Sequence, residues 1–216
     1  MSEEIDSSHP ETREALISML RDLPPEAFTG RHVLDRVPWL FSNRSQYVEW
    51  KSDLAADLDV DPFTLLVVGS AGIGFSLSPM KRFSAFGPKS DIDVAVVSQR
   101  HFEQAWKWLR ELGPARQLTK GSLELNMLTW HRKNLVFDGA IATERLLSKL
   151  PFGAHWRSGL GRAGNREPTI GRDIKIRLYR DFESLRFYHV NNVTALQLKL
   201  LASEVGSEPA ALPGIE

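Results

Sequence analysis

Two hydrophobic segments, each next to a polar motif, limit the fold of this chain most. Residues 63–68 end at Gly69 and Ser70, and residues 94–97 begin directly after Asp93. Short apolar runs rich in Val and Leu that are bounded by Gly, Ser and Asp predict buried β-strands. The chain is therefore expected to contain a sheet in which two strands carry polar residues at their ends.

The second motif brings two carboxylates to one face of a strand. Side chains alternate along a strand, so Asp91 and Asp93 point the same way while Ile92 points into the core. Carboxylate oxygens are preferred ligands of hard divalent cations, and this pair can share one or two of them. Gly69 permits a close approach of the backbone, and the N–H groups of the turn at Ser70 can bind a phosphate.

The order of these features is similar to the active-site signature of the DNA polymerase beta-like nucleotidyltransferase superfamily. That signature is a hydrophobic strand, Gly-Ser, a variable loop and then Ser-Asp-hydrophobic-Asp entering a second strand. Its diagnostic part covers residues 63–98, within a resemblance that extends over residues 43–205. The resemblance implies an α+β fold, a mixed β-sheet flanked by helices, with a long C-terminal helix.

The resemblance also implies where the nucleotide binds. The site is expected on the sheet face where Gly69, Ser70, Asp91 and Asp93 meet, with Ser90 beside the nucleotide. Asp91 and Asp93 would be catalytic and would hold Mg²⁺ or Mn²⁺. The loop of residues 76–89, which carries two lysines and an arginine, is expected to lie over the nucleotide.

The reaction implied by the resemblance is transfer of a nucleoside monophosphate from an NTP such as ATP to an acceptor. Members extend nucleic acids, modify antibiotics, make cyclic nucleotides, or nucleotidylate protein and RNA in bacterial toxin–antitoxin and phage-defence systems. The fold does not choose among these activities. A short chain without an appended nucleic-acid module is most similar to the last, stand-alone group. The expected partners are thus an NTP, an acceptor (RNA, protein or nucleotide) and a partner protein.

The third carboxylate that normally completes such a site is uncertain from the sequence. Residues 173–178 resemble the third-acid strand of polymerase beta itself, but Lys175 stands where the acid would lie. Three alternatives remain open. In the first, Asp173, on the same face as Lys175, is the third catalytic acid. In the second, that acid is Glu124, on a strand expected after the preceding helix. In the third, no third acid exists and Lys175 binds phosphate. In the last case, the chain is a degenerate nucleotidyltransferase that acts as a nucleotide-binding or partner-regulating module.

Composition narrows the setting. The chain has no cysteine, which excludes disulfides and thiolate metal sites. Its acidic N-terminus lacks a hydrophobic signal region and its apolar runs are too short to span a bilayer, so a soluble, cytoplasmic protein with no membrane partner is expected. Residues 1–62 carry 13 acidic and 6 basic side chains, whereas residues 153–186 carry eight basic and four acidic ones. The basic stretch suits triphosphate or nucleic acid, or ion pairs with the acidic N-terminal part.

Periodicity and capping residues predict the remaining elements. Helices are expected at residues 11–23, 43–58, 101–112 and 181–203, and strands at 122–129, 134–137 and 173–179. Residues 151–171, rich in Gly and Arg, are expected to form a loop. The predicted domains are an N-terminal helical extension at residues 1–42, a nucleotidyltransferase domain at 43–205 and a tail at 206–216.

Overall fold

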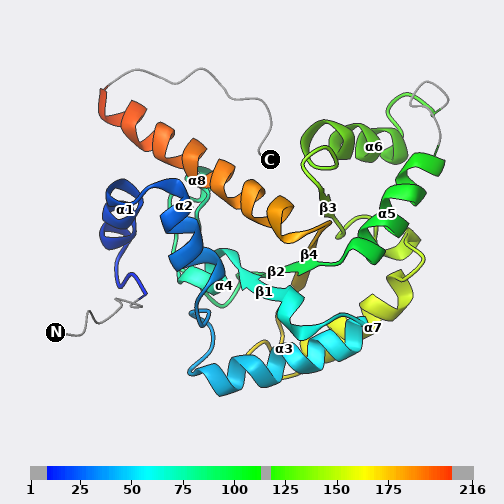
Figure 1. Ribbon diagram of the computed structural model, residues 1–216, viewed down its shortest axis with the longest axis horizontal. Coiled ribbons are helices and arrows are strands. Elements are labelled where there is room, and N and C mark those ends of the chain that lie inside the picture. The colour runs from blue at the N-terminus through cyan, green and yellow to red at the C-terminus, as the bar shows by residue number, and fades with distance from the viewer. Residues whose placement is uncertain (1–8, 113–117, 206–216) are drawn as a thin grey trace.

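The computed structural model describes residues 9–112 and 118–205, an α+β fold built around a four-stranded mixed sheet (Figure 1). The strand order is β1-β2-β4-β3. The central strands β2 and β4 pair in parallel, and each outer strand pairs antiparallel with its neighbour. The expected mixed sheet flanked by helices is thus confirmed. The strands are β1 (Leu65–Val68), β2 (Ile92–Val97), β3 (Ala140–Ala142) and β4 (Ile174–Tyr179).

Helices account for most of the rest of the described chain. The α-helices are α1 (Arg13–Asp22), α2 (Pro25–Phe28), α3 (Arg44–Leu58), α4 (Gly69–Ile73), α5 (Gln99–Glu111), α6 (Leu123–Asn134), α7 (Gly153–Ala163) and α8 (Phe182–Val205). Shorter helical turns are η1 (Thr29–Leu34), η2 (Pro62–Thr64), η3 (Pro79–Lys81) and η5 (Leu147–Lys149).

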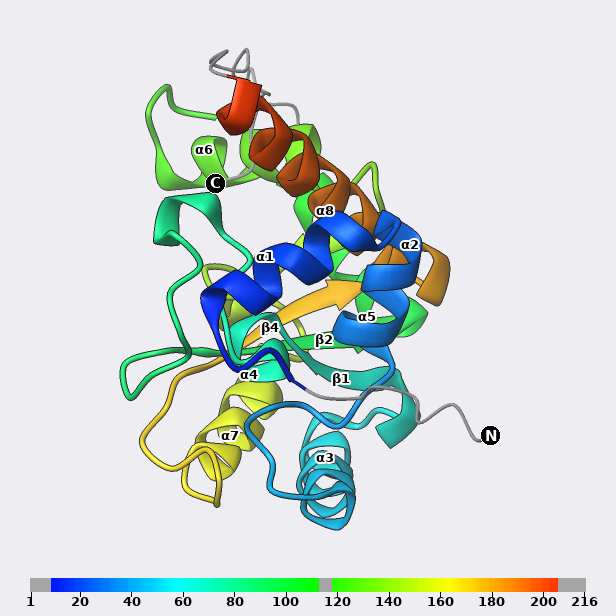
Figure 2. The ribbon, with the colours of Figure 1, turned by 90° about the vertical axis from the view of Figure 1, so that its left-hand side faces the viewer.

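The sheet separates two hydrophobic clusters, and successive side chains of β2 alternate between them. Ile92, Val94 and Val96 pack in the cluster that contains residues of α3, α5 and α7. Ala95 and Val97 join the cluster that contains residues of α1, α2 and α8. Figure 2 shows these two layers, with α8 and α1 on one side of the sheet and α3 and α7 on the other. Asp91 and Asp93 therefore belong to the α8 side.

Capping side chains begin the helices that the sequence predicted. The side chain of Asn43 accepts a hydrogen bond from the backbone N–H of Gln46 at 3.0 Å, which starts α3. Asp181 accepts one from the N–H of Ser184 at 2.7 Å, at the start of α8. Each bond satisfies an N–H that has no partner inside the helix. The predictions of α1, α3, α5 and α8 are confirmed to within a few residues.

The strand predicted at residues 122–129 is wrong, because this segment forms the first part of α6. The side chain of Ser122 accepts from the N–H of Leu125 at 3.1 Å and caps the helix. The buried residues are Met127, Leu128 and His131, whose spacing is that of one face of a helix. The alternation that includes Leu123 and Met127 had favoured a strand. Leu123 is in fact 56% exposed. Glu124 therefore lies on a helix.

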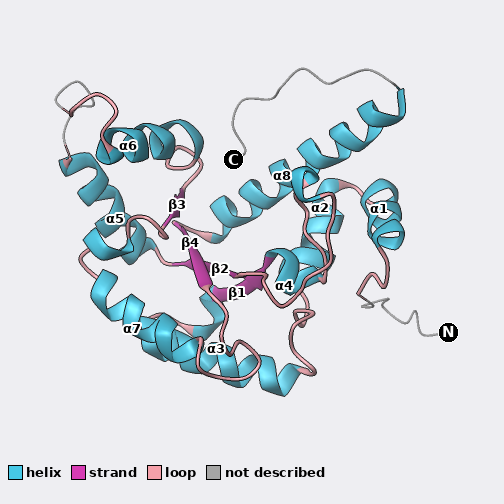
Figure 3. Ribbon diagram, turned by 180° about the vertical axis from the view of Figure 1, so that it is seen from behind, coloured by secondary structure: helices cyan, strands magenta, loops and turns pink. Residues whose placement is uncertain are grey.

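The predictions for residues 134–137 and 151–171 are also wrong. Residues 134–137 end α6 and turn, and the strand follows as β3. Residues 153–163, predicted as loop, form α7, whose Trp156, Gly159 and Ala163 face the core at helical spacing. Glycine serves packing here: a Cβ on Gly159 would lie 2.9 Å from the Cβ of Asp57 on α3. Figure 3 shows α3 and α7 side by side.

The described residues do not cover the whole chain. The segment 1–8 of the predicted N-terminal extension and the predicted tail at 206–216 lie outside them. Within residues 9–112 and 118–205, none of the helices combines the length and apolar content that a bilayer-spanning segment needs.

Two glycines on α7 give opposite expectations for stability. Gly159→Ala is expected to lower the free energy of unfolding by about 1–3 kcal/mol, because the new methyl group meets the α3 backbone and forces a shift. Gly161→Ala, on the same helix with no atom within 4 Å of its Cβ position, is the matched control and is expected to raise it by about 0.5–1 kcal/mol. Urea unfolding followed by circular dichroism measures both, and equal effects would contradict the packing role of Gly159.

Candidate functional site

The two predicted acids lie at the start of β2, next to the central strand β4. Asp93 pairs in register with Lys175 of β4 on one side and with Val68 of β1 on the other. Ile92, between the acids, is completely buried. The expected alternation is therefore present, with the acids on the sheet face that α8 covers. Side chains paired across adjacent strands lie on the same face, so Lys175 shares it.

Gly69 brings the end of β1 against the carboxylate of Asp93. Its φ is +65°, a conformation that favours glycine, and a Cβ there would lie 2.7 Å from Oδ2 of Asp93. The chain then enters the short helix α4, in which the carbonyl of Ser70 accepts from the N–H of Gly74 at 2.8 Å. The structure thus brings Gly69 and Asp93 together, and Ser70 follows in the first turn of α4.

The carboxylate of Asp91 forms an ion pair with Lys175. The ammonium of Lys175 donates a hydrogen bond to Oδ2 of Asp91, and both side chains remain partly exposed, at 40% and 35%. This hydrogen bond raises the pKa of Lys175, against a smaller effect of desolvation in the other direction. A partly exposed pair of this kind contributes only about 0.2–1 kcal/mol, so a competing ligand can break it at low cost.

Asp93 lies in a more enclosed position than Asp91. Its surroundings are dense enough that desolvation raises its pKa, although the positive charges of Arg177 and Lys175 act in the opposite direction. Part of the carboxylate still faces the cavity described below. A carboxylate that is ionised at some cost beside two cations is suited to accept a further positive charge.

Glu144 is a site residue that the sequence did not single out. Thr143 continues the pairing of β3 with β4, because its N–H donates to the carbonyl of Ile176 at 3.2 Å. Glu144, two positions beyond Ala142, which pairs with Arg177, begins a turn and lines the same cavity as Lys175. Its charge acts on both Lys175 and Asp93. The one available signal is an acid two residues beyond a short apolar strand, and the sequence did not predict a strand at β3.

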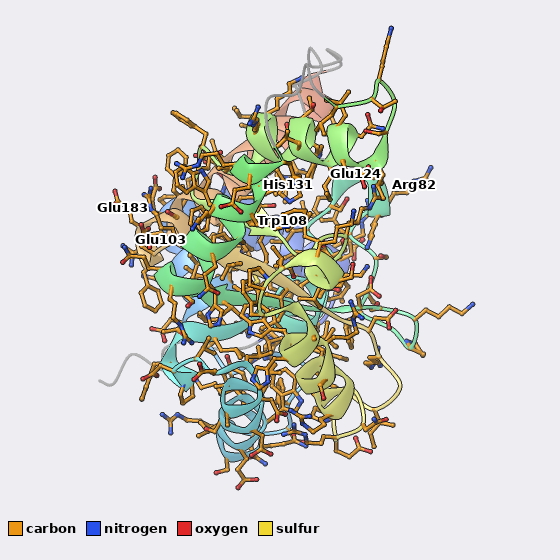
Figure 4. The ribbon with its side chains drawn as sticks, turned by 90° about the vertical axis from the view of Figure 1, so that its right-hand side faces the viewer. Arg82, Glu103, Trp108, Glu124, His131 and Glu183 are labelled. Atoms are coloured by element: carbon orange, nitrogen blue, oxygen red, sulfur yellow. The ribbon has the colours of Figure 1, made fainter. Side chains whose placement is uncertain are left out.

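The other predicted residues, Glu124, Asp173 and Ser90, have contacts of their own. Glu124 is on α6 (Figure 4), paired with Lys149 at 2.8 Å. Asp173 is exposed before β4, and its backbone carbonyl accepts from Ile92. The hydroxyl of Ser90 accepts from the N–H of Gly87 at 3.0 Å. Within the described residues, no three His, Cys, Asp or Glu side chains lie close enough together to hold a metal ion.

A cavity of about 1140 Å³ lies over this face of the sheet. Asp93, Glu144, Lys175 and Arg177 line its floor. Its walls come from α6 and α8, which stand on the same side of the sheet in Figure 1. Ligand pockets usually measure about 300–1,000 Å³, so this one can hold a nucleotide with part of a second molecule. Polar and charged wall residues are Asn126, Thr129, Lys133 and Asn134 on α6 and His189, Asn192 and Lys199 on α8.

The loop of residues 76–89 contributes Leu77, Ser78 and Met80 to the cavity lining. Two buried aromatic residues of the loop, Phe83 and Phe86, fix it to the molecule. Lys81 and Arg82 stay exposed, and Figure 4 shows the Arg82 side chain at the edge of the molecule. The loop therefore borders the cavity, while its basic side chains point to solvent.

The basic stretch of residues 153–186 divides between structure and site. Arg162 of α7 forms a 2.8 Å ion pair with Asp57 of α3, and Arg166, which follows α7, forms one with Asp53. These are the expected pairs with the acidic N-terminal part. In contrast, Lys175 and Arg177 line the cavity, and the Arg177 guanidinium lies 4.8 Å from the ring centre of Tyr188. Only the second group can meet a ligand on the cavity floor.

Known proteins supply no further guide to this site. No family model matches the chain, and no curated protein or solved structure matches it either. Any function assigned to the chain therefore rests on its own residues.

The enclosed position of Asp93 predicts a pH-dependent stability. Its folded pKa lies above the ordinary value, so ionising it weakens the fold as pH rises through that pKa. Asp93→Asn is expected to raise the free energy of unfolding at pH 7, and the gain should shrink as the pH falls towards the ordinary pKa of an aspartate. Denaturant unfolding from pH 4 to 8 measures this. Asp91→Asn, which removes the same charge but loses the Lys175 pair, should give no such gain; equal gains would contradict the assignment.

Proposed function

We propose that this protein is a metal-dependent nucleotidyltransferase that moves a nucleoside monophosphate from an NTP to an acceptor. The observation that carries the proposal is the contact of Asp93 with the Gly69 turn on the floor of a cavity. Asp91 shares the face of Asp93, and Lys175 and Arg177 stand beside them on β4. Acids for cations, bases for phosphates and a close backbone turn are the parts that phosphoryl chemistry needs.

Two acids on this face of the sheet suit a divalent cation, Asp93 on the cavity floor and Asp91, which precedes β2 and is not part of the cavity lining. Asp91 and Asp93 supply hard oxygen ligands, and desolvation, which raises the pKa of Asp93, is a cost that a bound cation would offset. Asp91 and Asp93 would hold Mg²⁺ or Mn²⁺, which when bound would stabilise charge on the entering and leaving oxygens. The chain's own groups do the rest by holding the triphosphate in line with the attacking hydroxyl.

The cations of the cavity suit the phosphates and the acceptor. Lys175 and Arg177 lie two residues apart on one face of β4, so both reach a polyphosphate over Asp93. Lys133 and Lys199 add positive charge higher on the walls. A cavity larger than one nucleotide needs leaves room for an acceptor, which we take to be RNA, a protein or a second nucleotide. To this we add the setting that the resemblance implies, a bacterial defence or toxin–antitoxin system with a partner protein.

A second candidate function follows from the Lys175 pair. An ammonium on Asp91 takes one of the two predicted metal ligands. A degenerate nucleotidyltransferase that only binds nucleotide, or regulates a partner through it, would keep such a pair permanently. The two candidates differ in whether NTP is consumed, which a direct assay distinguishes.

The main test is loss of transfer in the aspartate variants. Asp91→Ala and Asp93→Ala are each expected to abolish incorporation of label from NTP, because each removes a ligand of the cation. The assay incubates each α-labelled NTP with Mg²⁺ or Mn²⁺ and total bacterial RNA or protein. Glu124→Gln is the matched control, since Glu124 lies on α6 in a 2.8 Å ion pair with Lys149, and it should retain wild-type transfer.

Two results would reject the assignment. Full transfer by the Asp91→Ala, Asp93→Ala double variant would remove the active site from this face of the sheet. No transfer by the wild type to any acceptor, with NTP still bound, would favour the nucleotide-binding module instead.

Lys175→Asp separates a phosphate-binding lysine from a lost third acid. If Lys175 holds phosphate, the change puts a negative charge against the triphosphate and removes a charge-assisted hydrogen bond, costing roughly 1.5–3 kcal/mol of binding. We expect this loss, measured as NTP affinity by calorimetry. Higher turnover with unchanged NTP affinity would instead show that an acid belongs at this position and that the wild type is a decayed enzyme.

A further inference from the structure

Lys175 interacts with three acids. It donates to Oδ2 of Asp91, it pairs in register with Asp93 on β2, and Glu144, two residues beyond β3, lines the same cavity. All three acids act on Lys175 in the direction that favours its charged form. The ammonium is thus the counter-ion of this part of the cavity floor.

The same oxygen cannot serve the lysine and a divalent cation at once. While Lys175 holds Asp91, that carboxylate is neutralised and one of its oxygens is taken. The lysine side chain is flexible, with three donors on a compact charge, and it lines the cavity where a ligand can reach it. A polyphosphate on the floor offers it a more highly charged partner than a single carboxylate does.

We infer that Lys175 changes partner when nucleotide binds. The ammonium leaves Asp91 for the phosphates, which frees Asp91 to join Asp93 in holding the divalent cation. The nucleotide-free protein therefore excludes the cation, and nucleotide and cation enter together. This inference rests on the proposed nucleotide site, but it adds a coupling between nucleotide binding and cation binding that the proposed activity does not require.

Arg177 is a matched control for the charge of Lys175. Both are cations on the same face of β4, both line the cavity, and both act on Asp93. Only Lys175 is bonded to Asp91; the partner of Arg177 is the ring of Tyr188. Removing either one lowers the positive charge of the floor equally, but only removal of Lys175 frees Asp91.

A second control tests for effects of any lost surface ion pair. Lys149 and Glu124 form a pair whose side chains are 39% and 38% exposed, close to the values for Lys175 and Asp91. Neither Lys149 nor Glu124 lines the cavity. Lys149→Met should therefore change neither cation nor phosphate binding.

The experiment measures two ligands separately on the full chain. Mn²⁺ alone is titrated into the protein, and the free ion is followed by its electron paramagnetic resonance signal. Inorganic triphosphate alone is titrated by calorimetry in the presence of a chelator. The proteins are the wild type and the Lys175→Met, Arg177→Met and Lys149→Met variants. Circular dichroism and thermal unfolding establish that each variant is folded before it is compared.

The expected signature is an opposite effect of one substitution on the two ligands. Lys175→Met should bind Mn²⁺ more tightly than the wild type by roughly 5- to 150-fold, the usual range of coupling between two ligands, and bind triphosphate more weakly. Arg177→Met should also weaken triphosphate but leave Mn²⁺ affinity well below that of Lys175→Met. Unchanged Mn²⁺ affinity in Lys175→Met, or an equal rise in Arg177→Met, would overturn the exchange.

The test also separates the inference from the proposed function. If the wild type binds triphosphate and Lys175→Met gains no affinity for Mn²⁺, the exchange is wrong while the nucleotide site stands. If no protein in the series binds either ligand, the exchange and the proposed function fail together.

Discussion

The parallel pairing of β2 with β4 is the constraint on which the site depends. It joins two segments about eighty residues apart in the chain and sets Asp93 directly opposite Lys175. A shift of one residue in this register would turn the acids or the bases to the other face of the sheet, into the apolar cluster under α3 and α7. The hydrophobic alternation of both strands prevents that shift, because it would bury charges and expose Ile92 and Ile176. The packing of the core therefore fixes the chemistry of the cavity floor.

The layers around the sheet have different tasks. Below it, α3 and α7 approach closely at Gly159, bonded through the indole N–H of Trp156 to the carbonyl of Leu58 at 2.9 Å. This layer carries ion pairs and does not reach the cavity. Above it, α6 and α8 present polar residues to one another across open space. A helix normally buries an apolar face, so polar residues on two facing walls are more useful to a ligand than to the fold.

Charge balance on the floor links fold to function. Asp91, Asp93 and Glu144 face Lys175 and Arg177 within one sheet surface, where water is partly excluded. Each carboxylate can be satisfied by a lysine or by a divalent cation, and each cation by a carboxylate or by a phosphate. In the exchange that we propose, a small set of groups with exchangeable partners gives a site that is stable when empty and complete when loaded. A permanent pair of Lys175 with Asp91 would stabilise the empty site but would not allow nucleotide and cation to bind together.

The sequence by itself determined the strands β1, β2 and β4, the common face of Asp91 and Asp93, the turn at Gly69 and the capped helices, because each follows from local alternation or one capping side chain. It did not determine α6, α7 or β3. Gly159 favours a loop in the sequence, but in the structure it is needed because Asp57 of α3 packs against it. The alternation at Leu123 favours a strand, but the segment is a helix whose His131 bonds the carbonyl of Ala142 at 3.0 Å. Only the tertiary structure brought Glu144 into the cavity that Lys175 lines and gave Asp91 its partner, since both depend on pairing between strands far apart in the chain. Periodicity reports which way a side chain points; it does not report which side chain it meets.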